Sequence, residues 1–289
     1  MARSTTRKLS LYRLNISGLT EDETYHSVIL AALERTTLAD RIHKDGQRSH
    51  ALHSANQARL RLRMTYMSYR EGERPDILDT TNFDIMPNPL GANQTGVHWT
   101  HALGGEVNGK YYVALEEYIN GIRFTQIERY LQWLLDERYV RPKDAIDPLT
   151  VSVEAVPSAK FMQRVDSLER VTQATVRIAR PNFGWMDLED DLGEAAEQSD
   201  AKGVELTMKA RRGASLRRDR GLLSYVRELI GTGGAVFARV EGTRDGEADK
   251  FSTENLKVSS SVDMPMDDHG QLRDDAWPAF YEYLDREER

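Results

Sequence analysis

The densest group of residues that could do chemistry is a run of cations near the middle of the second half of the chain. One lysine and five arginines stand there against a single acid, Asp219, and the basic residues are Lys209, Arg211, Arg212, Arg217, Arg218 and Arg220. The whole chain has a net charge of −7, so attraction for a polyanion must come from a local surface. Because guanidinium groups pair well with phosphate, the run predicts nucleic-acid backbone contacts without base specificity.

The elements expected around this run would aim its cations at one point. The pattern predicts a strand over 204–210, a turn over Gly213–Ser215 and a helix over 216–230 with Ser215 as N-cap. Arg217, Arg218 and Arg220 would then lie in the first turns of that helix. Cations at this end oppose the helix dipole, so a bound polyanion explains them better than folding does.

A second basic stripe lies in the first half of the chain. Arg59, Arg61 and Arg63 alternate with Leu60, Leu62 and Met64, and Tyr66 and Tyr69 follow. In a strand over 58–69 the three guanidinium groups would project from one face while the apolar residues fill the core. We therefore expect this stripe to extend the phosphate-binding surface.

Intramolecular ion pairs are the rival interpretation of both basic groups. Acidic residues crowd a helix expected over 185–198, and more acids occupy the C-terminal segment, namely Asp267, Asp268, Asp274 and Asp275. Either set could neutralise the arginines or screen them until a competing anion arrives. An acidic protein partner held by the basic residues is a third hypothesis.

Arg48 and His53 supply the main enzymatic alternative. Their RxxxxH spacing resembles the catalytic pair of HEPN ribonucleases, in which arginine and histidine act on the 2′-hydroxyl and the scissile phosphate. Such an enzyme would need no metal. However, the pair lies in a polar segment and not on a clear bundle helix, so solvent-exposed loop residues are the simpler interpretation.

Three other spacings predict no site. Gly104, Gly109 and Lys110 follow most of the phosphate-loop pattern, but Tyr111 replaces the Ser or Thr that binds magnesium, and the segment joins two strands. His98 and His101 would face opposite sides of a strand. The acids between Asp187 and Asp200 fit a solvated helix face. We therefore expect no catalytic residue, no metal and no cofactor.

Composition places the chain among water-soluble globular proteins of ordinary core size. It has 289 residues, of which 39% are hydrophobic and 29% charged. Cysteine is absent, which suits a reducing compartment. The longest apolar runs are too short for a membrane span, and no apolar stretch follows the basic start to form a signal peptide. These features predict a cytoplasmic protein.

The order of expected elements predicts an α+β fold with mixed sheets and helices. An N-terminal βα unit and a hairpin around Asn108–Gly109 precede an amphipathic helix over 124–138, and a βαβαβα-ββα region follows. A helix expected over 20–35 would start with a capping box formed by Thr20 and Glu23. We expect an N-terminal α+β domain over 1–146 and a C-terminal α+β domain with the basic cluster over 147–289.

The second half of the chain resembles a bacterial and phage group that includes the phage-exclusion protein RexA and, more distantly, KwaB of the Kiwa antiphage system. Residues 149–231 carry the resemblance, with the strings "VSVEAV", "KFMQRVDSLERV", "TQATVRIARPN" and "LLSYVRELI" in the same order of elements. The resemblance implies a cytoplasmic phage-defence or exclusion factor that binds DNA with little sequence preference as a homodimer. It defines no functional residues, so the expected site comes from charge alone.

Overall fold

The computed structural model describes most of the chain. The described residues are 3–72, 77–78, 85–86, 88–91, 94–143, 145, 147–179, 203–231, 237–267 and 272–286. The helix expected over 185–198, with the acidic residues from Asp187 to Asp200, lies outside them, as do Asp268 and part of the irregular stretch expected over 76–96. The helices and strands of the described residues confirm the α+β class.

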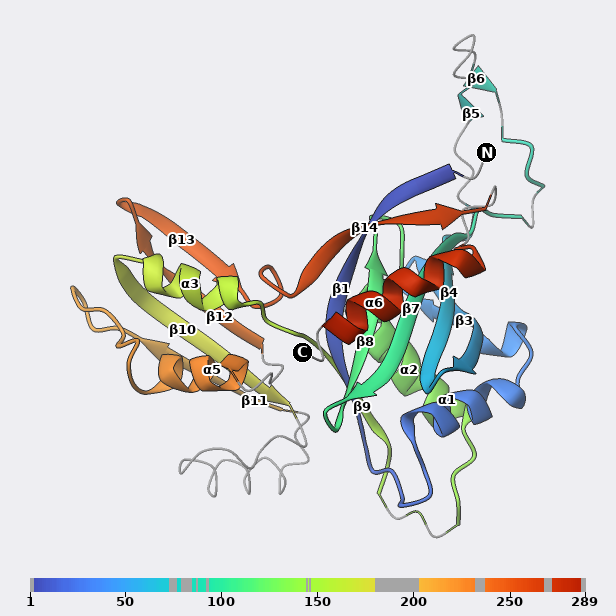
Figure 1. Ribbon diagram of the computed structural model, residues 1–289, viewed down its shortest axis with the longest axis horizontal. Coiled ribbons are helices and arrows are strands. Elements are labelled where there is room, and N and C mark those ends of the chain that lie inside the picture. Colours follow the sequence, from blue (N-terminus) through green and yellow to red (C-terminus); the bar gives the residue numbers. More distant parts are fainter. Residues whose placement is uncertain are drawn as a thin grey trace.

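The larger sheet forms the first lobe of the molecule (Figure 1, right). Its strands run in the order β14-β1-β8-β7-β4-β3-β2, and β9 also pairs with β1. The bounds of these strands are β1 Arg3–Ser17, β2 His43–Asp45, β3 Arg48–Ala58, β4 Arg61–Tyr69, β7 His98–Val107, β8 Lys110–Glu117, β9 Thr150–Ala155 and β14 Ser259–Met266. A separate short pair joins β5 Ile77–Leu78 to β6 Ile85–Met86. Each strand pair in the described chain is antiparallel, so the sheets are antiparallel and not mixed.

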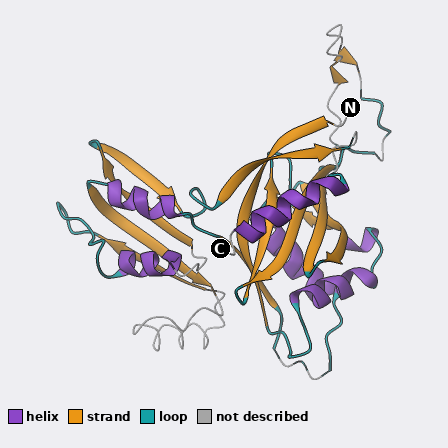
Figure 2. Cartoon of the chain, viewed as in Figure 1, coloured by secondary structure: helices purple, strands orange, loops and turns teal. Residues whose placement is uncertain are grey.

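Helices cover both faces of this sheet, as Figures 1 and 2 show. Helices α1 (Tyr25–Glu34) and α2 (Phe124–Arg138) pack on one face, and α6 (Trp277–Arg286), preceded by the 3₁₀ turn η2 (Asp274–Ala276), packs on the other. The strand face under α1 and α2 carries Leu62, Met64 and Tyr66. Alternation of side chains across the sheet thus divides the lobe into two hydrophobic cores.

A smaller sheet forms the second lobe (Figure 1, left). Its strand order is β11-β10-β12-β13, with bounds β10 Arg170–Ala179, β11 Gly203–Lys209, β12 Phe237–Arg244 and β13 Glu247–Ser252. Helices α3 (Ala159–Ser167) and α5 (Leu222–Gly231) pack on one face of this sheet and share one core with it. The second lobe therefore has two layers where the first has three.

The second lobe is inserted into the first, because its strands lie in sequence between β9 and β14. Both β9 and β14 pair with the same edge of β1, β14 along residues 3–10 and β9 along residues 12–17. Residues on both sides of the boundary expected at 147 therefore build the first sheet. Such pairings between distant segments are set by tertiary structure, which local sequence patterns do not reveal.

Two adjacent chain segments connect the lobes. The amide of Val258 donates to the carbonyl oxygen of Val156 at 2.8 Å, and the amide of Ser158 donates to the carbonyl oxygen of Leu256 at 2.9 Å. The Nζ atom of Lys257, between these bonds, lies 2.8 Å from a carboxylate oxygen of Glu117 on β8. The hydrogen bonds thus join the two segments to each other, and the ion pair ties them to the first sheet.

Several local expectations are confirmed. Helix α2 has the bounds expected for it, and the hairpin between β7 and β8 turns at Asn108 and Gly109, whose φ angles are 51° and 72°.

The expected capping box at Thr20 is wrong: α1 is capped by Thr24, which exchanges hydrogen bonds with Ser27. Glu23 instead accepts from the Thr20 amide within the preceding turn. None of the described helices is both long and apolar enough to cross a membrane.

Candidate nucleic-acid interface

Residues Lys209 to Arg220, here called the arginine loop, connect the end of β11 to α5 at the outer end of the second lobe (Figure 1). A tight turn closes from the Ala214 amide to the Arg211 carbonyl at 2.9 Å, with Gly213 at φ 81°. The amides of Ala210 and Leu216 each donate at 2.8 Å to carbonyl oxygens at the start of β10. The backbone of the loop is therefore held against the sheet on both sides of the turn.

Ser215 is not the N-cap of a helix, and the expected helix start at Leu216 is wrong. The Ser215 hydroxyl accepts instead from the amide of Val171 in β10 at 3.0 Å. Gly221 has φ 68°, which is incompatible with a right-handed helix, and α5 begins only at Leu222. The arginines at 217, 218 and 220 thus precede the helix and do not lie in its first turns.

Five of the six cations point to solvent. Exposed side chains in the loop belong to Lys209, Arg211, Arg212, Arg217 and Arg220. Arg218 is half-buried, and its guanidinium donates to the carbonyl oxygen of Leu168 at the end of α3. The sequence did not distinguish Arg218 from its neighbours, yet the structure gives it a different role.

The exposed cations of the loop differ from other basic side chains of the second lobe. Arg164 lies 2.7 Å from Asp249, and Arg227 lies 2.6 Å from Asp166. Lys250 and Arg177 likewise pair with neighbouring glutamates. Within the described residues, by contrast, none of the five exposed loop cations lies in an ion pair.

Arg170 extends the basic surface of the loop, and the run of cations from Lys209 to Arg220 does not include it. It begins β10, is exposed, and donates from Nη2 to the carbonyl oxygen of Ala214 at 3.1 Å. Its chain position is 39 residues before Lys209, so the spacing of basic residues gave no signal. Only the pairing of the loop with the start of β10 brings Arg170 to this surface.

The basic stripe of the first lobe does not form the single strand that the sequence predicts. Residues 58–69 are not a single strand: β3 ends at Ala58, and Arg59 and Leu60 form a tight turn with φ 51° and 62°. Arg59 therefore lies at a hairpin tip, and only Arg61 and Arg63 lie on β4. Neither turn residue is a usual turn former, so the regular alternation through them hid the turn.

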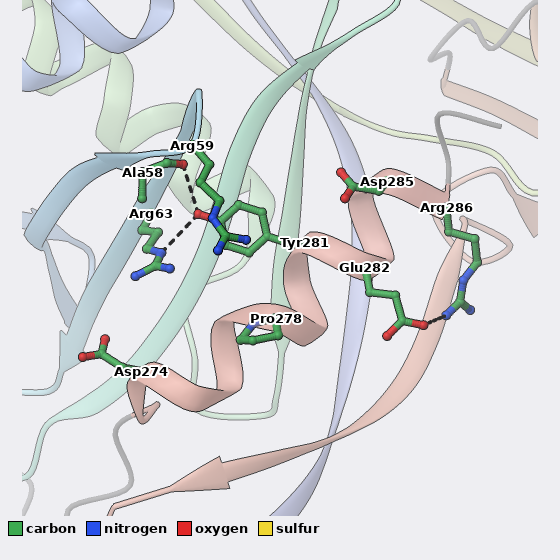
Figure 3. Close-up of a pocket in the computed structure, with 9 residues that line it drawn as sticks. All are labelled: Ala58, Arg59, Arg63, Asp274, Pro278, Tyr281, Glu282, Asp285 and Arg286. Carbon is green, nitrogen blue, oxygen red and sulfur yellow. Dashed lines mark hydrogen bonds and ion pairs between the residues drawn. The ribbon is translucent and has the colours of Figure 1, made fainter.

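Helix α6 contacts the arginines of this stripe, and Figure 3 shows Arg59 and Arg63 beside it. Arg61 is only 9% exposed and donates to the Glu106 carbonyl at 2.7 Å and to Asp285 at 3.2 Å. The guanidinium of Arg63 lies 5.1 Å from the ring centroid of Trp277 and donates to the hydroxyl of Tyr281 at 3.3 Å. For Arg61, the rival interpretation of pairing with the acidic C-terminal segment is therefore correct.

The hollow between the hairpin tip and α6 has a volume of about 650 Å³ and a mixed lining (Figure 3). Arg59 and Arg63 face acids of the C-terminal segment there, namely Asp274, Glu282 and Asp285. The first-lobe stripe and the arginine loop lie in different lobes (Figure 1). The structure does not bring the two expected halves of the site together.

Arg48 and His53 both lie on β3, and neither is on a helix. Arg48 donates to the carbonyl oxygen of Asn120 at 3.2 Å, and the exposed His53 packs edge-on against Trp99. This geometry gives no support to a ribonuclease pair.

The remaining patterns also belong to the structure of the first sheet. Gly104, Gly109 and Lys110 lie in the β7–β8 hairpin, and His101 is buried with its Nδ1 atom 2.8 Å from Glu116. No three His, Asp or Glu side chains of the described ranges gather so as to hold a metal ion.

No family model, curated protein or solved structure matches the chain.

Proposed function

We propose that the second lobe binds the phosphate backbone of DNA through the arginine loop, without base specificity and without catalysis. One observation carries this proposal: five exposed cations gather on one tethered loop and make no ion pair with any described residue, whereas Arg164 and Arg227 of the same lobe are each paired with an aspartate. Exposed like charges repel one another, so folding alone does not explain their concentration.

The contacting set is narrower than the sequence indicated. It comprises Lys209, Arg211, Arg212, Arg217 and Arg220, with Arg170 beside them. Arg218 is not in this set, because its guanidinium donates to the carbonyl oxygen of Leu168. The first-lobe arginines are not in it either, because Arg61 and Arg63 contact α6. Arginine suits such a surface because its planar guanidinium can donate two parallel hydrogen bonds to one phosphate.

The cellular setting of the proposal rests on the resemblance of residues 149–231 to phage-exclusion and antiphage-defence proteins. From this resemblance we propose that the protein is a cytoplasmic homodimer that acts against phage infection. A plaque assay with the wild type and a variant lacking the five loop cations would test that setting separately from DNA binding. Retained protection by a variant that binds no DNA would favour an acidic protein partner instead.

Fluorescence anisotropy with a labelled duplex at low salt tests the binding itself. We expect the wild type to bind, and the variant with all five exposed loop cations changed to glutamine to lose most of its affinity. A matched control changes five exposed cations of the first lobe to glutamine, namely Arg35, Lys44, Arg70, Arg123 and Lys143. Both variants have the same formal charge, −7 − 5 = −12.

The comparison separates a local site from a general charge effect. If the loop is the site, the first-lobe control binds close to wild-type strength. Equal losses in the two variants would show that net charge and not the arginine loop governs binding. No binding by the wild type in low salt would refute the proposal.

A further inference from the structure

The tip of the β3–β4 hairpin adopts an unfavourable backbone conformation. Arg59 and Leu60 both have positive φ, 51° and 62°, a region in which glycine, asparagine and aspartate are favoured. The side chain of Leu60 is also 82% exposed. Backbone strain of this kind tends to persist where it serves a function.

A groove of about 820 Å³ lies between this tip and α1. Helix α1 forms one wall with Ser27, Leu30 and Glu34, and the hairpin tip forms the other with Leu60 and Arg61. The exposed Leu60 and the half-buried Leu30 give the two walls an apolar part. We call this space the tip groove.

Two polar atoms among the residues lining the groove are buried without a hydrogen-bond partner in the described chain: the hydroxyl of Tyr111 and Nε2 of His26. Tyr111 is only 5% exposed, and its ring stacks on Tyr25 with 4.5 Å between centroids. Gly104 makes room for it, since a Cβ there would lie 2.4 Å from the hydroxyl. Buried polar atoms are normally paired, so each of these two atoms has an unused capacity for a hydrogen bond.

One cation acts on the same end of the groove, the almost buried guanidinium of Arg61, which is also paired with Asp285 of α6. Burial together with this charge lowers the pKa of His26 below its usual range, against a smaller effect of Glu106. His26 is therefore neutral near pH 7 and can donate from Nε2 in one tautomer. Two potential donors close to a cation suit a negatively charged oxygen.

We propose that the tip groove binds a small organic anion with an apolar or aromatic body. Its carboxylate or phosphate oxygen accepts from Tyr111 and His26 in the field of Arg61, and its body lies between Leu30 and Leu60. The exposed carboxylates of Glu34 and Glu106 also line the groove and disfavour a polyanion. The site is therefore distinct from the arginine loop.

Calorimetric titration with benzoate and with phenyl phosphate tests the proposal, and benzyl alcohol serves as the uncharged analogue. We expect at least one anion to bind saturably and the alcohol not to bind; which anion binds better identifies a carboxylate or a phosphate ligand. Absence of saturable binding by both anions, or equal binding of the alcohol, would overturn the proposal.

Tyr111→Phe removes only the unpartnered hydroxyl, so we expect a Tm no lower than that of the wild type and about tenfold weaker anion binding. Tyr112→Phe is the matched control, since Tyr112 neighbours it on β8 but packs toward α6, and it should bind like the wild type. Unchanged affinity in Tyr111→Phe would contradict the assignment.

A double change of the tip tests the strained turn. Arg59→Asn with Leu60→Gly gives the sequence that such turns favour, so the Tm should rise. Binding should weaken, because the apolar wall from Leu60 is lost. A higher Tm with unchanged anion affinity would show that the tip has no part in the site.

Discussion

The guanidinium of Arg218 donates to the backbone carbonyl oxygen of Leu168, the C-cap residue of α3. The last carbonyls of a helix lack partners within the helix, and a cation at that end also interacts favourably with the helix dipole. Arg218 therefore stabilises the junction between α3 and the arginine loop. Its five basic neighbours in the loop are exposed instead, and they are the proposed phosphate contacts.

Arg218→Gln should therefore lower the stability of the fold, whereas Arg217→Gln should weaken DNA binding. Loss of the Arg218 contact leaves a partly buried carbonyl unpaired, so the free energy of unfolding should fall by about 1 to 2 kcal/mol. Arg217→Gln should change it by less than about 0.5 kcal/mol but weaken DNA binding. Urea unfolding curves measure the first effect. Equal destabilisation by the two changes would contradict the distinction.

Glu116 should be essential to the first sheet. It is fully buried, with its carboxylate 3.1 Å from Nε of Arg7 and 2.8 Å from Nδ1 of His101. Nε2 of His101 in turn accepts from the Leu272 amide, which holds the segment before α6. Glu116→Gln leaves a cation without its partner, so we expect a loss of about 3 kcal/mol in the free energy of unfolding.

The exposed pair between Lys44 and Glu71 provides the control for that change, with the two side chains 66% and 65% exposed. Glu71→Gln should alter the free energy of unfolding by less than about 1 kcal/mol. Chemical denaturation of both variants at one pH makes the comparison. A loss at Glu116 as small as that at Glu71 would show that the buried cluster is not important for stability.

His50 predicts a specific acid sensitivity. It is fully buried, and burial lowers its pKa to about 4 from the usual 6.5. Charged groups around it have smaller effects, those of Asp45, Arg48, His43 and Arg129. Because the folded state binds the proton less well than the unfolded state, the stabilising effect is complete above pH 6.5 and declines as the pH falls toward 4.

The loss from His50 should reach about 2 to 3 kcal/mol at pH 4. His50→Leu removes the titrating group, so the free energy of unfolding of this variant should depend less on pH between 6.5 and 4. Denaturation at a series of pH values measures the difference. Parallel pH profiles for wild type and variant would exclude His50 as the cause.

Sequence patterns predicted elements whose signals are local. Helix α2 shows this, because Ile127, Leu131, Leu134 and Leu135 recur at helical spacing and lie buried in the core. The hairpin at Asn108–Gly109 was equally predictable from residues that tolerate positive φ. The turn at Arg59–Leu60 was not, because its residues disfavour the conformation they adopt.

Pairings between distant segments could not be predicted in this way. Residues of β9 and β14 meet on one edge of β1 although more than 100 positions separate them. Asp285 reaches Arg61 only because α6 returns to the first sheet. The basic cluster itself was visible in the sequence, but the inward direction of Arg218 and the approach of Arg170 depend on tertiary contacts.

The salt dependence of DNA affinity tests the central claim most directly. Each phosphate contact contributes a slope of about 0.9 to the fall of log K with log salt. Arg211→Gln or Arg217→Gln should each reduce the slope by about one unit, while Arg63→Gln in the first lobe leaves it unchanged. Unaltered slopes in the two loop variants, or an equal reduction in Arg63→Gln, would contradict a phosphate-binding arginine loop.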